Sequence, residues 1–378
     1  MKTRFWDLSL VLLCAALLLG FGAAILLLPH SDFSEAENRA LTTWKAPTVK
    51  QIADGSFTQR LSDLYADQFP LRARFTALKA TVERCLGKQE NNGVLFGKEG
   101  YLIPRSEQAD QSVLENNLSA CQELHALSAE QGVPLSVLTV PRSVDVTTAY
   151  YPTGFATDPP ILRRLTDDPS IVFPLSQLQS AASRGEAVWY KTDHHWTTAG
   201  AYLAYCSFAQ ELEIQPYPPE YFTPVTVTDA FLGTSYSKVG GLPTEADSIV
   251  LYRYPNDTRF IVQNGETGES TAGFYQLSAL EQKDKYEVFL GGNYSRLTVT
   301  NPTKQKPRLL LVKDSFANAL VPFLALHFDI DVIDPRYDKA SLSLHEYDRI
   351  LIVQGIDTLA TDPSLGRWVS KQKQNLSS

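Results

Sequence analysis

The sequence RLLLVKDSF, residues 308–316, combines a short apolar run with a polar turn. The apolar run at 308–312 is typical of a strand that is buried on both faces. The turn Lys313-Asp314-Ser315 follows, and residues 316–327 are predicted to form a helix. A strand, a tight turn and a helix in this order are the unit from which parallel sheets are built. The stretch therefore predicts an α/β fold.

Short strands and helices alternate on both sides of this stretch. Apolar runs predict strands at 134–140, 187–190, 330–333 and 350–354, and helical spacing predicts helices at 114–131, 160–165 and 199–212. Such alternation is typical of a parallel sheet with helices on both faces. From about 214 to 300 the chain has short strands and turns rich in Tyr, Thr and Gly, which predicts a β-rich insertion.

The region before this pattern also has recognisable elements. Helical spacing over 57–86 is interrupted at Pro70, so two helices are predicted, because a proline ring clashes with the preceding helical turn. Glycines punctuate residues 92–102, which predicts two short strands around a Lys-Glu-Gly turn.

The N-terminal segment is predicted to be a membrane anchor. Leu8–Leu28 contains 21 residues and no charge. At 1.5 Å per residue, a helix of that length covers roughly 30 Å, the thickness of the hydrocarbon core of a bilayer. Lys2 and Arg4 precede it, which favours a cytoplasmic N-terminus and an extracytoplasmic remainder. A cleavable signal peptide is the alternative, but its apolar region is usually shorter and ends at a small-x-small site.

These features predict the domain organisation. A cytoplasmic tail (1–7), a transmembrane anchor (8–28) and a juxtamembrane linker (29–56) would precede an α/β domain at 57–378. An apolar content of 44% supports a folded core. The net charge of −8, without a basic stripe, argues against a nucleic-acid partner. No cofactor is expected.

The densest group of reactive side chains is KTDHHWTTAG, residues 191–200, with two of the six histidines. Thr197 or Thr198 suits the N-cap of the helix predicted from 199. The cluster would then lie between a strand and a helix, at the sheet edge where open α/β proteins bind ligands. Side chains two apart in an extended segment share a face, so Asp193 and His195 are expected together and His194 on the other side.

A carboxylate beside an imidazole fixes the tautomer of the ring and stabilises its protonated form, as in a serine triad. A buried Asp–His hydrogen bond without catalysis is the alternative. Ser315 is the candidate nucleophile, because the predicted turn exposes it at the carboxyl edge of the sheet beside the amides of a helix N-terminus. The alternative for Ser315 is a helix cap.

Two rival sites remain open at this point. Ser235, in the turn Gly233-Thr234-Ser235-Tyr236-Ser237, is a second candidate nucleophile, but no long helix follows it. Asp193, His194 and His195 are all possible metal ligands, as in phosphoesterases with a DHH signature. The chain lacks the further DxD carboxylates of those enzymes and a third suitably spaced histidine, so no metal is expected.

At these residues the chain resembles DHHW-family proteins. That group is similar to the J- and X-type alginate O-acetylation proteins, which carry an SGNH-hydrolase-like domain. The stretches that carry the resemblance are 34–41 (SEAENRAL), 67–72 (DQFPLR), 92–97 (NGVLFG), 192–202 (TDHHWTTAGAY), 284–286 (DKY), 289–293 (FLGGN) and 313–318 (KDSFAN).

The resemblance implies an SGNH-hydrolase-like fold and a role for each site residue. Asp193, His195 and Ser315 would be the acid, base and nucleophile. Asn318, Asn293 and Gly355 are the candidates for holding the oxyanion, and Trp196 and Lys313 for contacting substrate. Lys313 stands where the SGNH serine block usually has glycine, and the acid and base are separated by one residue instead of two.

The resemblance also implies a function. Relatives move or remove acetyl groups on cell-envelope polysaccharides, and some work beside a multipass membrane O-acyltransferase. An extracytoplasmic domain, anchored in the cell membrane by one helix, fits that role. The chain is therefore expected to be an O-acetyltransferase or O-acetylesterase with a polysaccharide partner. The alternatives are a non-catalytic polysaccharide-binding scaffold and a metal-dependent phosphoesterase.

Overall fold

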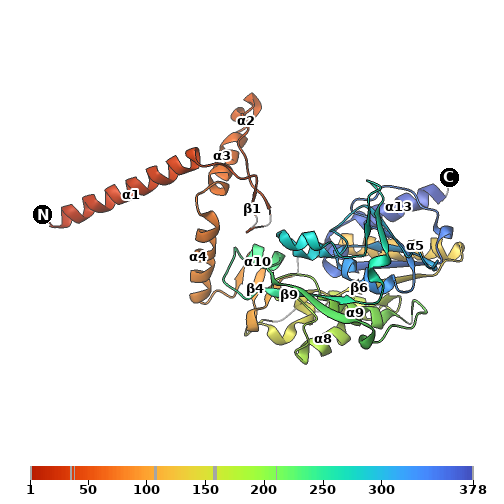
Figure 1. Ribbon diagram of the computed structural model, residues 1–378. Helices are drawn as coiled ribbons and strands as arrows, with labels where there is room; N and C mark the ends of the chain where they lie inside the picture. The colour runs from red at the N-terminus through yellow and green to blue at the C-terminus, as the bar shows by residue number, and fades with distance from the viewer. Residues whose placement is uncertain are drawn as a thin grey trace. The chain divides into compact units, whose positions relative to one another are not determined.

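A computed structural model describes residues 2–34, 36–37, 39–105, 109–155, 160–209 and 211–376 (Figure 1). Glu35 and Asn38, in one of the stretches that carry the family resemblance, lie outside the described residues. The chain forms two compact units. The first comprises residues 1–91 and 236–243, and the second residues 92–235 and 244–378. The predicted domain boundaries at 7, 28 and 56 stay predictions.

The first unit contains the N-terminal helix α1, Lys2–Leu27. Its segment Trp6–Ile25 is long and apolar enough to cross a membrane. The predicted break at Pro70 is confirmed, because α3 ends at Asp67 and α4 begins at Arg72. The other elements of this unit are β1 (Phe33–Ser34), β2 (Arg39–Ala40), α2 (Val49–Ala53), α3 (Ser56–Asp67), α4 (Arg72–Cys85) and β3 (Glu90–Asn91).

The second unit is built on an eight-stranded mixed sheet with the order β11-β10-β12-β14-β13-β15-β6-β7. Strands β14, β13, β15 and β6 are parallel, as predicted, and the short strand β7, which was not predicted, pairs in parallel with β6. Strands β12, β10 and β11, from the β-rich segment, continue the same sheet in antiparallel pairing. The bounds are β6 Leu135–Val140, β7 Ile171–Val172, β10 Ile261–Asn264, β11 Ser270–Ala272, β12 Arg296–Thr300, β13 Arg308–Lys313, β14 Asp329–Ile333 and β15 Arg349–Gly355.

Both faces of the sheet are covered, which explains the continuous apolar run in β13. Leu309 and Leu311 pack into one core cluster, and Leu310 and Val312 into another on the opposite face. All four side chains are fully buried. The first cluster includes residues of α8 (Leu175–Ser183), α9 (Thr198–Phe208) and α11 (Val321–Leu324), and the second residues of α5 (Gln111–Glu130), α7 (Pro160–Thr166), α12 (Ile356–Thr361) and α13 (Ser364–Leu376).

Several smaller elements complete the unit. Strands β4 and β5 flank a short turn over Lys98–Gly100, which confirms the predicted pair of strands. Strands β8 and β9 form a separate antiparallel pair. The bounds are β4 Val94–Phe96, β5 Leu102–Pro104, α6 Ser143–Val146, β8 Thr223–Phe231, α10 Thr234–Lys238 (which also extends into the first unit) and β9 Asp247–Arg253.

Two local predictions are wrong. Residues 187–190 do not form a strand of the sheet, because their backbone pairs with the loop that follows, through the isolated bridge Trp189↔Trp196 and the bond from the Thr197 amide to the Val188 carbonyl (3.0 Å). The long helix at 316–327 is divided into the 3₁₀ turn η7, Ser315–Ala319, and α11. Pro322 explains the division, since proline is tolerated only in the first turn of a helix, where α11 places it.

Candidate active site

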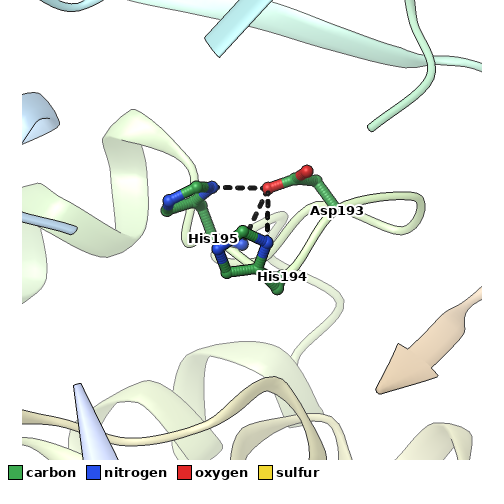
Figure 2. A group of neighbouring side chains, drawn as sticks. All are labelled: Asp193, His194 and His195. Atoms are coloured by element: carbon green, nitrogen blue, oxygen red, sulfur yellow. Dashed lines mark hydrogen bonds and ion pairs between the residues drawn. The ribbon is translucent and has the colours of Figure 1, made fainter. Parts of the chain in front are cut away.

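Asp193, His195 and Ser315 form a hydrogen-bonded chain at the carboxyl end of β13. The Nδ1 atom of His195 lies 2.6 Å from Oδ1 of Asp193, and its Nε2 atom lies 2.9 Å from Oγ of Ser315. Figure 2 shows the carboxylate directed at the imidazoles of both His194 and His195. With Nδ1–H donating to the carboxylate, Nε2 accepts the Ser315 hydroxyl proton, which is the tautomer that a general base requires.

The turn at Gly233-Thr234 holds the Asp193 carboxylate from its other side. Oδ2 of Asp193 accepts hydrogen bonds from the Thr234 amide (2.7 Å) and hydroxyl (3.0 Å). Burial raises the pKa of Asp193, but the charges of His194 and His195 and the hydrogen bonds from His195 and the Thr234 amide outweigh it, so the pKa lies below its usual range. The carboxylate is therefore ionised at neutral pH, as the stabiliser of a protonated imidazole must be.

Asp247, at the start of β9, fixes the backbone just before Asp193. Its carboxylate accepts bonds from the amides of Lys191 (2.9 Å) and Thr192 (2.8 Å) and from the Thr192 hydroxyl (2.6 Å). These bonds hold the loop that carries the DHHW sequence against β9, a strand far along the chain. They position the loop in place of the sheet strand that was expected at 187–190.

The imidazole of His195 is enclosed by aromatic rings. Tyr286 stacks on it, with ring centroids 3.8 Å apart and an interplanar angle of 8°, and the ring of His194 lies at the same distance. Phe316 contacts it edge-on at 5.1 Å. Only 6% of His195 is exposed, and the Nε2 edge of its ring faces Ser315.

The expectation that His194 points away from Asp193 is wrong. Residues 191–195 bend instead of running extended, so the alternation of side chains does not apply. Nδ1 of His194 lies 3.7 Å from Oδ1 of Asp193 and 2.6 Å from the Thr234 hydroxyl oxygen. The His194 side chain remains 41% exposed, which places a second imidazole at the rim of the site.

Asp314, not Ser315, caps the short helix after β13. One of its carboxylate oxygens accepts the Phe316 amide (3.1 Å), and the other accepts the Gly355 amide (2.7 Å) and the Thr358 hydroxyl (2.8 Å). The capping alternative for Ser315 is therefore not what the structure shows. Its half-buried hydroxyl contacts His195 instead.

The three oxyanion candidates have internal partners. The Gly355 amide donates to Asp314, and the Asn318 amide nitrogen lies 3.2 Å from the Gly292 carbonyl oxygen and 3.4 Å from Oδ1 of Asn293. The same oxygen of Asn293 accepts a bond from Lys313 Nζ at 2.8 Å. Their assignment to the oxyanion stays a prediction, and for Gly355 it would require the bond to Asp314 to break.

Trp196 and Lys313, expected to contact substrate, are placed inside the protein. Trp196 is fully buried, and its ring nitrogen donates to the Phe316 carbonyl (3.0 Å). Lys313 is 1% exposed, and its ammonium group lies against Asn293 and, at 3.8 Å, Asp334. Neither side chain is open to a bound sugar. Both instead hold neighbouring parts of the site in place.

The buried Lys313 predicts a pH dependence of folding stability. Burial lowers its pKa from 10.5 to about 8, although Asp334 opposes this shift. Between these values the unfolded chain binds more protons than the folded chain, so stability rises with pH. From about pH 7 to about pH 9.5, wild type should gain about 2 kcal/mol of unfolding free energy relative to Lys313→Met. Urea unfolding followed by tryptophan fluorescence measures this difference. A constant difference between the two proteins would contradict it.

The rival sites are less well supported. Ser235 is fully buried, and its hydroxyl has no hydrogen-bond partner among the described residues, so it forms no hydrogen bond with either histidine. The ligand atoms of Asp193, His194 and His195 lie within 4.8 Å of one another. The Asp193 and His195 atoms lie 2.6 Å apart, however, which is a hydrogen-bond distance. Two tetrahedral ligands at about 2.0–2.2 Å from an ion would lie about 3.4 Å from each other.

Sequence reasoning missed the residues that orient the triad. Thr234 lies in the turn that was considered only as a rival nucleophile site, and Asp247 lies more than fifty residues from the loop it holds. Tyr286 belongs to the family-like stretch DKY, which was a usable signal. The capping role of Asp314 could also have been expected, because aspartate is a preferred N-cap residue.

Two family models match this part of the chain. Residues 175–333 match the model described as DHHW protein, and residues 94–236 match the SGNH hydrolase-like domain of acetyltransferase AlgX. The first contains Asp193, His195 and Ser315, and the second covers the first two. The resemblance found in the sequence is therefore confirmed.

Curated relatives and solved structures agree with these matches. The chain is 25% identical over 215 residues to the probable alginate O-acetylase AlgJ of Pseudomonas syringae pv. tomato, covering 52% of this chain and 54% of the relative. It is 28% identical over 169 residues to AlgJ of Pseudomonas fluorescens, covering 40% and 42%. The chain thus spans about half the length of the curated relatives it matches.

The fold is that of two solved proteins. A DHHW family protein from Eubacterium siraeum superposes with a TM-score of 0.57 at 19% identity, covering 73% of this chain and 95% of that one. Bacillus cereus PatB1 superposes with a TM-score of 0.59 at 17% identity, covering 72% and 98%. These likenesses show the α/β fold, and the match to the SGNH hydrolase-like domain model identifies that fold as SGNH-like.

Proposed function

Because this chain carries a DHHW region that overlaps an SGNH hydrolase-like domain, we propose that it is a serine-dependent O-acyl-transfer enzyme of the cell envelope. The observation that carries the proposal is the continuous contact from Asp193 through His195 to Ser315, at 2.6 and 2.9 Å. A carboxylate, an imidazole and a hydroxyl in this order form the arrangement that activates a serine for acyl transfer.

The first half of the proposed reaction acylates Ser315. Its Oγ attacks the carbonyl carbon of an acetyl ester, and its proton passes to Nε2 of His195. The ionised Asp193 stabilises the imidazolium that results. When the tetrahedral intermediate collapses, the bond to the leaving oxygen breaks and the proton on Nε2 passes to that oxygen. The acetyl group remains on Ser315.

The second half regenerates the serine. A hydroxyl of the acceptor gives its proton to Nε2 and attacks the acetyl carbon, and Oγ leaves with that proton. A sugar hydroxyl as acceptor makes the protein a transferase, and water makes it an esterase. The backbone amide of Ser315 has no acceptor among the described residues, so it is a suitable donor to the oxyanion in both halves.

The proposed setting is the outer side of the cell membrane. The apolar helix α1 supports an anchor, and Lys2 and Arg4 before it favour a cytoplasmic N-terminus. The AlgJ relatives are named as probable alginate O-acetylases, which supports a cell-envelope polysaccharide as substrate. A multipass membrane O-acyltransferase as acetyl donor is part of the same proposal.

Purified full-length protein in detergent tests the proposal with a chromogenic acetyl ester. We expect ester turnover, with acetyl groups appearing on an added polysaccharide if the protein is a transferase and only free acetate if it is an esterase. Turnover should be unaffected by a chelator, because no metal takes part in the proposed steps. The absence of turnover with and without polysaccharide would favour a non-catalytic scaffold, and loss of activity with chelator that zinc or manganese restores would favour a metal enzyme.

A further inference from the structure

A hollow lies near the amino end of β13, opposite to the carboxyl end that Ser315 follows. Its volume is about 200 Å³, and it is formed where the chain enters β13. Its walls come from residues 217–221, 254–260, 301–306 and Leu326. Ser315 follows the carboxyl end of β13, whereas 301–306 precede its amino end. The six residues of β13 alone separate the two places by roughly 20 Å.

Tyrosine rings form one wall of this hollow. The rings of Tyr217 and Tyr221 lie 4.4 Å apart, and Tyr221 stacks on Tyr254 at 6.0 Å and 30°. The Tyr254 hydroxyl donates to the Pro322 carbonyl (2.9 Å), which fixes that ring as part of the wall. Tyr217 and Tyr221 are half-buried, and the exposed part of each residue lines the hollow. Aromatic faces of this kind suit the apolar C–H face of a sugar ring.

Three cationic side chains line the same hollow. Arg259 and Lys304 are exposed, and neither forms an ion pair with a carboxylate among the described residues. Lys306 is half-buried, with its ammonium group bound to the Ala325 carbonyl and lying 4.9 Å from the centre of the Phe260 ring. Burial lowers the pKa of Lys306 to about 8, so it is still mostly charged at neutral pH.

The residues that line the hollow include three cations and no carboxylate, in a chain with a net charge of −8. Asp329 is the nearby acid: it accepts the amides of Asn301 and Lys306 and raises the pKa of Lys306. One carboxylate against three cations leaves an excess of positive charge, which an anion in the hollow would balance. The volume is below that of a typical drug-sized pocket, which fits a single sugar residue better than a larger ligand. Asn256, Asn301 and Thr303 add hydrogen-bonding groups at the rim.

We propose that this hollow is a binding site for an acid-bearing sugar residue of a polysaccharide, separate from the triad. The tyrosines would contact the ring of the sugar, and Arg259, Lys304 and Lys306 its acid group. If the proposed acyl transfer is correct, the site would hold one residue of a polymer while a residue several units away reaches Ser315. Only the delivery of another sugar residue to Ser315 rests on the proposed function. Binding of the polymer in the hollow does not require the triad.

Polymer binding to full-length Ser315→Ala protein in detergent tests the site without turnover. The probes are an unacetylated polyuronate, a poly(glycerol phosphate) and neutral dextran, which separate a carboxylate from a phosphate and both from an uncharged sugar. We expect at least one anionic polymer to bind and dextran to bind far more weakly. Adding Arg259→Glu with Lys304→Glu should weaken that binding by about tenfold or more and reduce its salt dependence. Tyr221→Ala should weaken it without changing the charge.

The matched control is Arg163→Glu with Lys339→Glu, which makes the same charge change at exposed positions outside the hollow. Equal loss of binding in this control, or unchanged binding in both hollow variants, would overturn the proposal. In the active protein, the hollow variants should raise KM for the polymer and leave turnover of the small ester unchanged. If wild type binds polymer through this hollow but turns over no ester, the binding site stands and the acyl-transfer proposal fails.

Discussion

Ser315→Ala is expected to lower kcat/KM for a small acetyl ester by roughly 10⁴-fold or more, because the hydroxyl that receives the acetyl group is removed. His195→Ala should cause a loss of similar size. The double variant should be scarcely slower than either single variant, because the two residues act in the same steps. Steady-state kinetics on the four proteins measure both the size of the loss and its non-additivity.

A loss of this size is informative only if the variants fold. Ser315 is half-buried and its backbone sits in a turn capped by Asp314, so alanine should leave the turn intact. Tryptophan fluorescence reports on Trp189 and Trp196 directly behind the site. Ser176→Ala, at an exposed position on α8, is the control for an unrelated serine and should retain full activity. Equal rates for wild type, Ser315→Ala and His195→Ala would refute the proposed mechanism.

Gly233→Ala is expected to be nearly as damaging, although this residue has no reactive group. A Cβ atom at this position would lie 2.3 Å from Oδ2 and 2.4 Å from Cβ of Asp193. The carboxylate would have to move, which breaks its bonds to Thr234 and its alignment with His195. Because replacing the triad aspartate with asparagine costs about 10⁴-fold in kcat, displacing it should cost on the order of 10³-fold or more.

Gly366→Ala is the matched control for that substitution. It lies in helix α13, and its nearest new contact would be 3.4 Å from Oδ1 of Asn117, an ordinary van der Waals distance. Alanine is favoured over glycine inside a helix, so this variant should be as active as wild type and no less stable. The kcat of Asp193→Asn, measured in the same assay, shows how the loss in Gly233→Ala compares with the loss of the carboxylate itself. If Gly233→Ala keeps wild-type kcat, the turn at 233–234 does not position the carboxylate.

The parts of the fold that could be predicted are those with a local signature. A continuous apolar run such as Leu309–Val312 can be stable only where both faces are covered, so the parallel strands followed from sequence. Asp193, His195 and Ser315 were expected at one edge of the sheet, and the three side chains do contact one another. The expected reason was only half right, because residues 187–190 do not form a strand of the sheet. Contacts with distant residues such as Asp247 hold the DHHW loop instead, and the catalytic roles stay a prediction.

The remaining features depend on contacts between distant residues. The hydrogen bond between Thr234 and the DHHW loop spans 41 positions in the sequence, and those between Asp247 and the loop span 55–56. No sequence pattern in either segment predicts these bonds. Strands β10, β11 and β12 were expected as β structure, but their pairing onto β14 depends on register rather than composition. The break in the predicted 316–327 helix was predictable, since Pro322 lies in the middle of it.

The most direct measurement is the mass of the acylated protein. Full-length wild type is mixed with excess acetyl ester, quenched in acid within the first turnovers and digested for mass spectrometry. We predict that the peptide containing Ser315 gains the mass of one acetyl group, with the modification on Ser315, and that Ser315→Ala shows none. Turnover with no acetylated Ser315 peptide, or with the acetyl group on another residue in both proteins, would contradict a Ser315 acyl-enzyme.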